Sequence, residues 1–238
     1  MRAGAIWHDV ECGAYSADLV LWEELAAAAE GPVVELGCGT GRVALHLARR
    51  GHEVVGVDSD AELIEELAAR AEGLPLAALA ADARDFRLSD DAALTLAPMQ
   101  MLQLLPGAAE RIDCLRHVAS QLRPGGRFAA AILEEMPEPD GAPPPLPDVR
   151  EVDGWVYSSL AVEAAVGPEE ILIRRRRQIV SPVGELSEEG NEVRIATFPA
   201  AQLEDEAAAA GLSPVSRHEI PPTDIHVGTL VVVLGKAG

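Results

Sequence analysis

The chain lacks the features that mark several large classes of protein. It has three cysteines in 238 residues, Cys12, Cys38 and Cys114, and their odd number and wide spacing argue against a disulfide framework or a zinc site. No apolar run approaches the roughly 20 residues needed to span a membrane, and the first residues have no signal-peptide apolar region. We therefore expect a cytoplasmic protein with no metal and no membrane partner.

Basic residues are scarce as well. The chain has 19 Lys and Arg against 39 Asp and Glu, a net charge of -20. Since proteins bind DNA and RNA largely by neutralising phosphates with Lys and Arg, we expect no nucleic-acid partner. The one basic cluster, residues 174–177, is flanked by Ile and Val in a strand pattern, so alternate arginines face opposite sides. A solvated face paired with Glu is expected, although Arg174 and Arg176 could offer a carboxylate-binding edge to an acidic acceptor.

What the chain has is enough apolar sequence for a full core. Its hydrophobic content is 48%, and its length fits one large domain or a domain with an insertion. The abundance of Ala, Arg and Pro indicates a bacterial source with a high-GC genome.

The most informative stretch runs from Val33 to Gly41, an apolar strand that reaches Glu35 and then has glycines at alternate positions. Glycines let the backbone turn sharply and approach a ligand closely, because they accept positive φ and carry no Cβ. A helix is predicted over 42–50 and a second strand over 53–57. That strand ends at Asp58, 21 residues after Gly37, where a first βαβ unit holds a ribose by its two hydroxyls.

The glycine spacing separates two classes of cofactor. A dinucleotide fingerprint is G-x-G-x-x-G, whereas here the third glycine comes one residue earlier and Glu35 precedes the loop. An acid there would repel a pyrophosphate and attract an ammonium group. The pattern Glu-x-Gly-x-Gly-x-Gly resembles the first motif of the class I S-adenosylmethionine-dependent methyltransferases, whose cofactor has an amino-acid end, a sulfonium and no phosphate.

Later motifs extend this resemblance over residues 15–134. A short strand, 76–80, leads to Asp82, where the family has an acid that contacts the adenine amino group. A fourth strand, 93–97, leads into the loop that lies under the methionine part of the cofactor in such enzymes, and a fifth strand follows over 127–133. The resemblance implies S-adenosyl-L-methionine as cofactor and S-adenosyl-L-homocysteine as product. It implies a cofactor site formed by Tyr15, Glu35, Gly37, Cys38, Gly39, Gly41, Asp58, Ser59, Asp82, Ala83, Ala97 and Met99.

The predicted fold is α/β, a Rossmann-like doubly wound sheet that is mostly parallel with an antiparallel last strand, plus an antiparallel β insertion after strand five. We divide the chain into a helical lead-in or lid (1–30), a cofactor-binding half (31–136), a Pro-rich linker with the insertion (137–197), and a final helix with the last strands of the core (198–238). The insertion is read as three strands, 150–163, 169–180 and 191–197. We expect it to cap the acceptor pocket, and it could also pair two subunits as a homodimer.

The predicted function is transfer of a methyl group to N, O or C of a small-molecule metabolite. The sulfonium is a strong electrophile, so the protein mainly has to hold the acceptor in line and exclude water. His226 is the candidate base, because an antiparallel last strand brings residues 223–226 to the rim of the sheet where the cofactor lies. Glu134, after strand five, reaches the same rim. Two alternatives remain: a non-catalytic protein that binds S-adenosylmethionine, and an NAD-dependent oxidoreductase.

Overall fold

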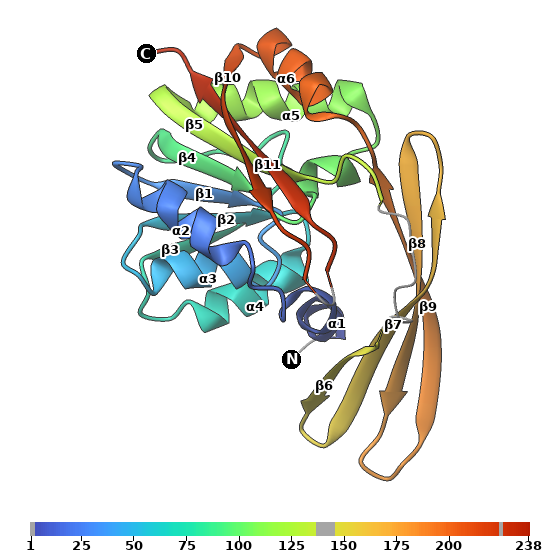
Figure 1. Cartoon of the computed structure of the whole chain (residues 1–238). Coiled ribbons are helices and arrows are strands. Elements are labelled where there is room, and N and C mark those ends of the chain that lie inside the picture. The colour runs from blue at the N-terminus through green and yellow to red at the C-terminus, as the bar shows by residue number, and fades with distance from the viewer. Residues whose placement is uncertain (1–2, 137–145, 224–225) are drawn as a thin grey trace.

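The structure is a computed structural model that describes residues 3–136, 146–223 and 226–238. Figure 1 shows an α/β core beside a separate, elongated antiparallel sheet. Residues 137–145 of the predicted Pro-rich linker, and residues 224–225 of the segment predicted to reach the rim of the sheet, lie outside the described residues. In the described part of the chain no helix is long and apolar enough to cross a membrane.

The core sheet has seven strands in the order β10-β11-β5-β4-β1-β2-β3. Six strands run in the same direction, and only β11, between β10 and β5, runs antiparallel to its neighbours, which confirms the predicted fold class. The predicted strands are present, and the fifth begins at Leu122 and not at residue 127, because Leu122 already pairs with Ala92 before the register shift that spans residues 123–126. The strands are β1 (Val33–Leu36), β2 (Val54–Asp58), β3 (Leu76–Ala80), β4 (Ala92–Ala97), β5 (Leu122–Ile132), β10 (Leu212–Ile220) and β11 (Thr229–Lys236).

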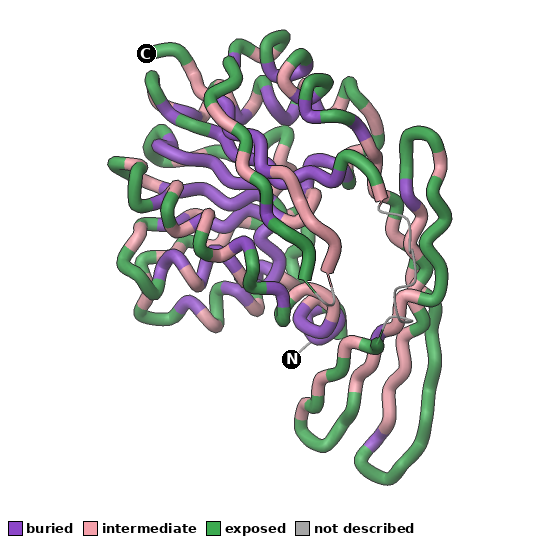
Figure 2. Tube along the Cα trace, viewed as in Figure 1, coloured by how far each residue is buried: buried purple, intermediate pink, exposed green. Residues whose placement is uncertain are grey.

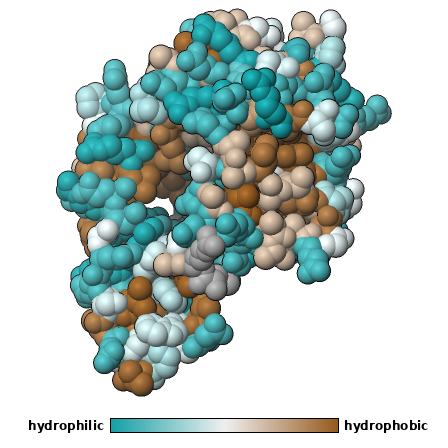
Figure 3. Space-filling model, turned by 180° about the vertical axis from the view of Figure 1, so that it is seen from behind, coloured by the Kyte–Doolittle hydropathy of each residue, from teal (hydrophilic) through white to brown (hydrophobic). Residues whose placement is uncertain are grey.

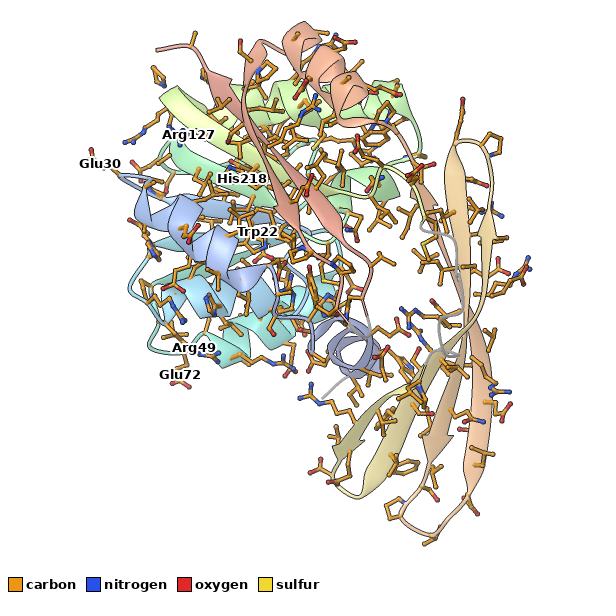
Figure 4. All side chains as sticks on the ribbon, viewed as in Figure 1. Trp22, Glu30, Arg49, Glu72, Arg127 and His218 are labelled. Atoms are coloured by element: carbon orange, nitrogen blue, oxygen red, sulfur yellow. The ribbon has the colours of Figure 1, made fainter. Side chains whose placement is uncertain are left out.

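Helices cover both faces of this sheet. On one face lie α2 (Leu19–Ala27), α3 (Arg42–Ala48) and α4 (Ala61–Arg70), and on the other α5 (Ala108–Gln121) and α6 (Ala200–Ala209). The central strands are therefore buried along their length, as Figure 2 shows. Figure 4 shows Trp22 between α2 and the sheet, whereas Glu30, Arg49 and Glu72 lie on the periphery. Strand ends and connecting loops are thus left to form a site.

The second sheet has four antiparallel strands in sequence order: β6 (Asp148–Val152), β7 (Trp155–Val166), β8 (Glu170–Val180) and β9 (Leu186–Ala196). The predicted single strand over 150–163 is wrong, because a two-residue hairpin turn divides it. Asp153 and Gly154 both adopt positive φ, 51° and 82°, which suits the right-handed twist of the flanking strands. An Asp-Gly pair is a known hairpin signal, so this turn was readable from the sequence.

The second sheet is fixed to the core at two places. At one end, α1 (Ala3–Cys12) packs Trp7 against Tyr157 of β7, with ring centroids 5.4 Å apart. At the other end, Gln103 lies in a short 3-10 helix, η1 (Met101–Leu104), and its amide group hydrogen-bonds to backbone groups of Leu133 and Ala196. The sheet is therefore held at both ends, and Figure 3 shows the molecule hollowed between it and the core.

Candidate functional site

A cavity of about 490 Å³ opens at the carboxyl ends of β1, β2 and β4. These ends meet at one rim because the strands are parallel, as expected for a doubly wound sheet. The structure brings eight of the predicted cofactor residues to the cavity wall. They are Glu35, Gly37, Cys38, Asp58, Ser59, Asp82, Ala83 and Met99.

Glu35 lies at the inner end of this cavity and is 3% exposed. Its carboxylate accepts a hydrogen bond from the Ala44 amide near the N-terminus of α3, but its Oε2 atom is buried and has no partner among the described residues. Burial raises the pKa of Glu35 to about 8, although the nearby Arg42 guanidinium opposes this. A cationic ligand group beside Oε2 would satisfy the buried oxygen and favour the ionised carboxylate.

The glycine turn between β1 and α3 has no space for side chains. Gly37 and Gly39 have φ values of 64° and 53°, and a Cβ added to them would meet Met101 and the His8 ring respectively. The Gly39 amide donates to Oδ2 of Asp58 at 2.8 Å, so the end of β2 holds the turn in place. The Oδ1 atom of Asp58 accepts from the Asp60 amide at 2.9 Å. Each oxygen of Asp58 keeps a lone pair for a ligand hydroxyl.

Asp82 lies past β3 at the outer part of the cavity. Its carboxylate is bound by the Arg84 side chain at 2.6 and 2.8 Å and by the Arg84 amide at 2.8 Å. These bonds lower the pKa of Asp82 to about 2, so the group is an anion and a hydrogen-bond acceptor across the neutral range. Arg84 was not among the predicted site residues, and its position two residues after Asp82 is the local signal that indicates it.

Four of the predicted cofactor residues lie outside the cavity wall. Gly39 is covered by His8, Gly41 is the N-cap of α3 with φ of 95°, and Ala97 is buried at the end of β4. Tyr15 lines a smaller neighbouring pocket instead. These residues shape the turn and the strand end but do not form the surface of the cavity.

The helix α1, part of the predicted helical lead-in, covers the glycine turn with residues that were not among the predicted cofactor residues. His8 and Cys12 of this helix line the cavity. His8 Nδ1 is 3.1 Å from Thr40 Oγ1, which donates to Asp9 Oδ1 at 2.6 Å. Burial lowers the pKa of His8, so its ring is neutral at pH 7. Nothing local in the sequence pairs α1 with the turn, because the contact spans about 30 residues.

Tyr15 and His226 form the wall of the smaller pocket, of about 60 Å³, together with Asp18. Met99 lines both this pocket and the cavity, so the two are adjacent. Met99 and Gln100 have positive φ values of 48° and 59°, a strained geometry for residues other than glycine. The Gln100 side chain donates to Thr229 Oγ1 at 3.1 Å, which fixes this loop against the start of β11.

Glu134, the second predicted catalytic residue, is engaged elsewhere. Its Oε1 atom accepts a hydrogen bond of 2.6 Å from the Ala200 amide at the start of α6. It therefore satisfies one of the free amides of that helix, and it is absent from the described residues that line the cavity and the smaller pocket.

The four arginines of β8 divide between its two faces. Arg174 pairs with Glu163 and Glu192 on the exposed face, at 2.7 Å each, which is the surface pairing expected for it. Arg177 faces the core, where it makes two bonds of 2.8 and 2.9 Å to Glu11 of α1. The odd-numbered arginines, not Arg174 and Arg176, thus face the hollow. A strand pattern gives the alternation, but only the docking of the sheet decides which face is inward.

Comparison with known proteins relates this geometry to a family. Residues 33–126 match the model of a family described as a methyltransferase domain. The S-adenosyl-L-methionine-dependent Diels-Alderase iccD of Talaromyces variabilis is 34% identical over 122 residues, 48% of this chain and 40% of that protein. The cypemycin N-terminal methyltransferase of a Streptomyces species is 31% identical over 119 residues, 50% of this chain and 47% of that protein. The chain thus spans less than half the length of these two relatives.

A solved structure is similar over nearly the whole chain. The CcbJ methyltransferase from Streptomyces caelestis superposes with a TM-score of 0.67 at 26% identity, covering 95% of this chain and 98% of that one. Residues 33–126 thus form a methyltransferase domain, and the fold is that of the class I S-adenosylmethionine-dependent methyltransferases. The family match begins at the first residue of β1 and ends in β5, so it covers the elements that build the cavity. The recognition made from the glycine motif is confirmed.

Proposed function

We propose that the chain is a methyltransferase of the EC 2.1.1 class that uses S-adenosyl-L-methionine to methylate N, O or C of a small-molecule acceptor, releasing S-adenosyl-L-homocysteine. The observation that carries the proposal is the buried, unpartnered Oε2 of Glu35 at the end of β1. A carboxylate in that place suits the ammonium of an amino-acid moiety. The pyrophosphate of a dinucleotide would gain no opposite charge there and would oppose ionisation of Glu35, which disfavours an NAD-dependent oxidoreductase.

The residues present fit the cofactor. Glu35 would face its ammonium group, Asp58 its ribose hydroxyls, and Asp82 with Ala83 its adenine. Gly37, Cys38, Ser59 and Met99 would contact it through the cavity wall, while Tyr15, Gly39, Gly41 and Ala97 hold the surrounding backbone. The bound cofactor supplies an electrophilic methyl group, so the protein has to orient the acceptor toward that group and exclude water.

The acceptor would lie where the cavity meets the Tyr15–His226 pocket. Burial lowers the pKa of His226 below its ordinary 6.5, so the ring is neutral at pH 7 and can take a proton from an amine or hydroxyl acceptor. We assign Glu134 to positioning α6 and leave His226 as the candidate base. A helical lid of residues 1–30 and a cap formed by the second sheet would exclude water from this space.

Two measurements test the proposal. Calorimetry should detect binding of S-adenosylhomocysteine and S-adenosylmethionine but not of NAD. Incubation with S-adenosylmethionine labelled in the methyl group should transfer label to a small molecule from a panel of amines, phenols and acids, with equal formation of S-adenosylhomocysteine. Binding of NAD in place of both ligands would overturn the assignment.

A second candidate has support from one relative. The name of iccD describes a Diels-Alderase that depends on S-adenosylmethionine, a reaction in which no methyl group moves. A protein of that kind would bind the cofactor and leave its methyl group in place. Measurement of S-adenosylhomocysteine formation separates the two functions, because only methyl transfer produces it.

We further propose that the protein works in the bacterial cytoplasm and pairs as a homodimer through the second sheet. The pairing rests on a row of apolar side chains across its outer face, Val156, Val180 and Leu186, which are register partners on β7, β8 and β9. Val156 and Leu186 are 36% and 58% exposed. Light scattering should give a dimer for the wild type and a monomer for the Val156→Lys, Leu186→Lys variant, and a monomeric wild type would overturn this part.

A further inference from the structure

Arg175, on the inner face of the second sheet, has guanidinium N–H donors that have no acceptor among the described residues. Arg177 and Arg175 lie two residues apart on β8 and so point to the same side. Arg177 is held by Glu11 through two bonds and lies over the Trp7 ring at 5.0 Å. In the described part of the chain, Arg175 makes one ion pair, to Asp148 of β6, at 3.4 Å.

That single contact is long and leaves most of the guanidinium free. A guanidinium carries five N–H donors in a planar fork, and its strong pairs are bidentate at about 2.7 to 2.9 Å. The contact between Arg175 Nη1 and Asp148 Oδ2 uses one donor at the far limit of a hydrogen bond. The Arg175 side chain is 21% exposed, so its remaining donors are partly removed from water, and none of the described residues accepts from them.

Arg175 lies close to the proposed reaction space. The fields of Arg175 and Asp148 both act on the Cys12 thiol, which lines the cofactor cavity, and on the His226 ring, which lines the adjacent pocket. Because charges act strongly only over short distances, the Arg175–Asp148 pair lies near both pockets, which meet at Met99.

A second residue beside Arg175 has a buried polar atom with no hydrogen-bond partner among the described residues. Asn191 of β9 is the register partner of Arg175, so the two side chains lie on the same face of the sheet. The Oδ1 atom of Asn191 is buried and makes no hydrogen bond with the described residues. A buried acceptor of this kind costs stability unless a donor reaches it.

Resting on the function proposed above, we propose that Arg175 binds a carboxylate of the methyl acceptor and that Asn191 meets a donor on the same molecule. The planar fork of Arg175 matches the two oxygens of a carboxylate, and the long contact to Asp148 leaves this fork open. In a chain of net charge -20, such a cation on the inner face selects anionic acceptors over neutral ones. The acceptor class is a small carboxylic acid that also carries an N–H or O–H group.

The test uses benzoate as the carboxylate probe and benzamide as its neutral equivalent, titrated into the full-length protein saturated with S-adenosylhomocysteine. We expect calorimetry or chemical-shift changes to show benzoate binding to the wild type with at least tenfold preference over benzamide. Arg175→Gln should weaken benzoate binding at least tenfold. The matched control is Arg176→Gln, the same change on the opposite face of the same strand, which should leave benzoate affinity within twofold.

A second variant separates ligand recognition from a structural ion pair. Asp148→Asn removes the carboxylate that competes for Arg175 and should tighten benzoate binding about fivefold. Equal affinity for benzoate in the wild type, Arg175→Gln and Asp148→Asn would overturn the proposal, as would absence of benzoate binding to the wild type. Titrations are repeated without S-adenosylhomocysteine, so a failure of cofactor binding would count against the proposed function while benzoate still tests Arg175.

Discussion

The rings of Tyr15 and His226 stack with centroids 4.6 Å apart and planes inclined by 25°. Tyr15 follows α1 near the start of the chain and His226 precedes β11 near its end, so this contact joins the lid to the antiparallel last strand of the core. Arg42 lies over the same tyrosine ring, 5.1 Å from its centroid. The stack fixes the imidazole of His226 beside the cavity.

Replacing His226 tests whether the ring acts as a base. His226→Asn should lower kcat about 10²-fold and leave cofactor affinity within twofold, because general-base catalysis contributes about that much. Since burial lowers the pKa of His226, the wild-type rate should rise with pH below 6.5 and level off above it, and the variant should lose this rise. His218→Asn is the control, because His218 lies on β10 and bonds to Ser216. An unchanged rate and pH profile in His226→Asn would remove the assignment.

Glu35 should release a proton when the cofactor binds. Its pKa of about 8 keeps the carboxyl group largely protonated in the free protein at pH 7, whereas an adjacent ammonium favours the ionised form. Calorimetry with S-adenosylhomocysteine in buffers of different ionisation heat should therefore show release of about one proton at pH 7. Glu35→Gln should bind more weakly and release none. Equal proton release by both proteins would contradict this assignment.

The Glu35 carboxyl group should lower the free energy of unfolding as pH rises, whereas most acidic groups raise it. Because its pKa is raised in the folded state, the folded protein holds more protons than the unfolded chain between about pH 4.5 and 8. Glu35 therefore makes the free energy of unfolding fall as pH rises through this window. Urea denaturation across the window should show a shallower fall for Glu35→Gln, and parallel curves would exclude the raised pKa.

Asp58 should be the main acidic residue that binds the ribose hydroxyl groups of the cofactor. Asp58→Ala should weaken S-adenosylhomocysteine binding by about 1.5 to 3 kcal/mol, because it removes a charged acceptor and frees the Gly39 amide of the glycine turn. Asp60→Ala is the control: Asp60 caps α4 by accepting from the Glu62 amide at 2.8 Å, so its loss costs about 1 kcal/mol of stability and no affinity. Calorimetry with wild-type affinity in Asp58→Ala would disprove the role.

Glu134 offers a test of capping against catalysis. Glu134→Ala should lower the free energy of unfolding by about 1 kcal/mol, since the Ala200 amide loses its acceptor, and should leave kcat within twofold. Glu135→Ala, an exposed neighbour, should change neither quantity. A large loss of kcat in Glu134→Ala alone would restore the catalytic interpretation.

Asp9 should hold the lid on the cavity. It is 6% exposed and bonds to Arg70 at 2.6 Å and to Arg150 of β6 at 2.9 Å. Hydrogen bonds from Arg70 and Thr40 overcome the effect of burial and hold the pKa of Asp9 below its ordinary value. Asp9→Ala should therefore lower the free energy of unfolding by about 3 kcal/mol.

Urea denaturation measures this loss, and the control is Asp85→Ala. Asp85 pairs with Arg87 at 3.5 Å on the surface, where such pairs contribute less than about 1 kcal/mol. Similar losses of unfolding free energy in the two variants would show that the ion pairs of Asp9 stabilise the protein no more than a surface pair does. Weaker cofactor binding in Asp9→Ala is also expected, because His8 and Cys12 reach the cavity from the same helix.

The sequence alone determined the parallel core and the cofactor half of the site. Alternating glycines, strand ends and the spacing from Gly37 to Asp58 are local features, and parallel strands must bring their carboxyl ends to one rim. That is why Glu35, Asp58 and Asp82 could be placed together before the structure. The hairpin turn at Asp153 and Gly154 is equally local, because an Asp-Gly pair favours this turn by itself.

Tertiary structure decided the remaining features, because each depends on how distant segments pack. His8 reaches the glycine turn because α1 buries Ile6, Trp7 and Val10 against the second sheet and bonds Asp9 to α4. The docking of that sheet turns Arg175 inward and leaves Arg174 outside. Local sequence determines that side chains alternate between the two faces of a strand. Which face is turned inward depends on the element that packs against the sheet, and no short stretch of sequence contains that information.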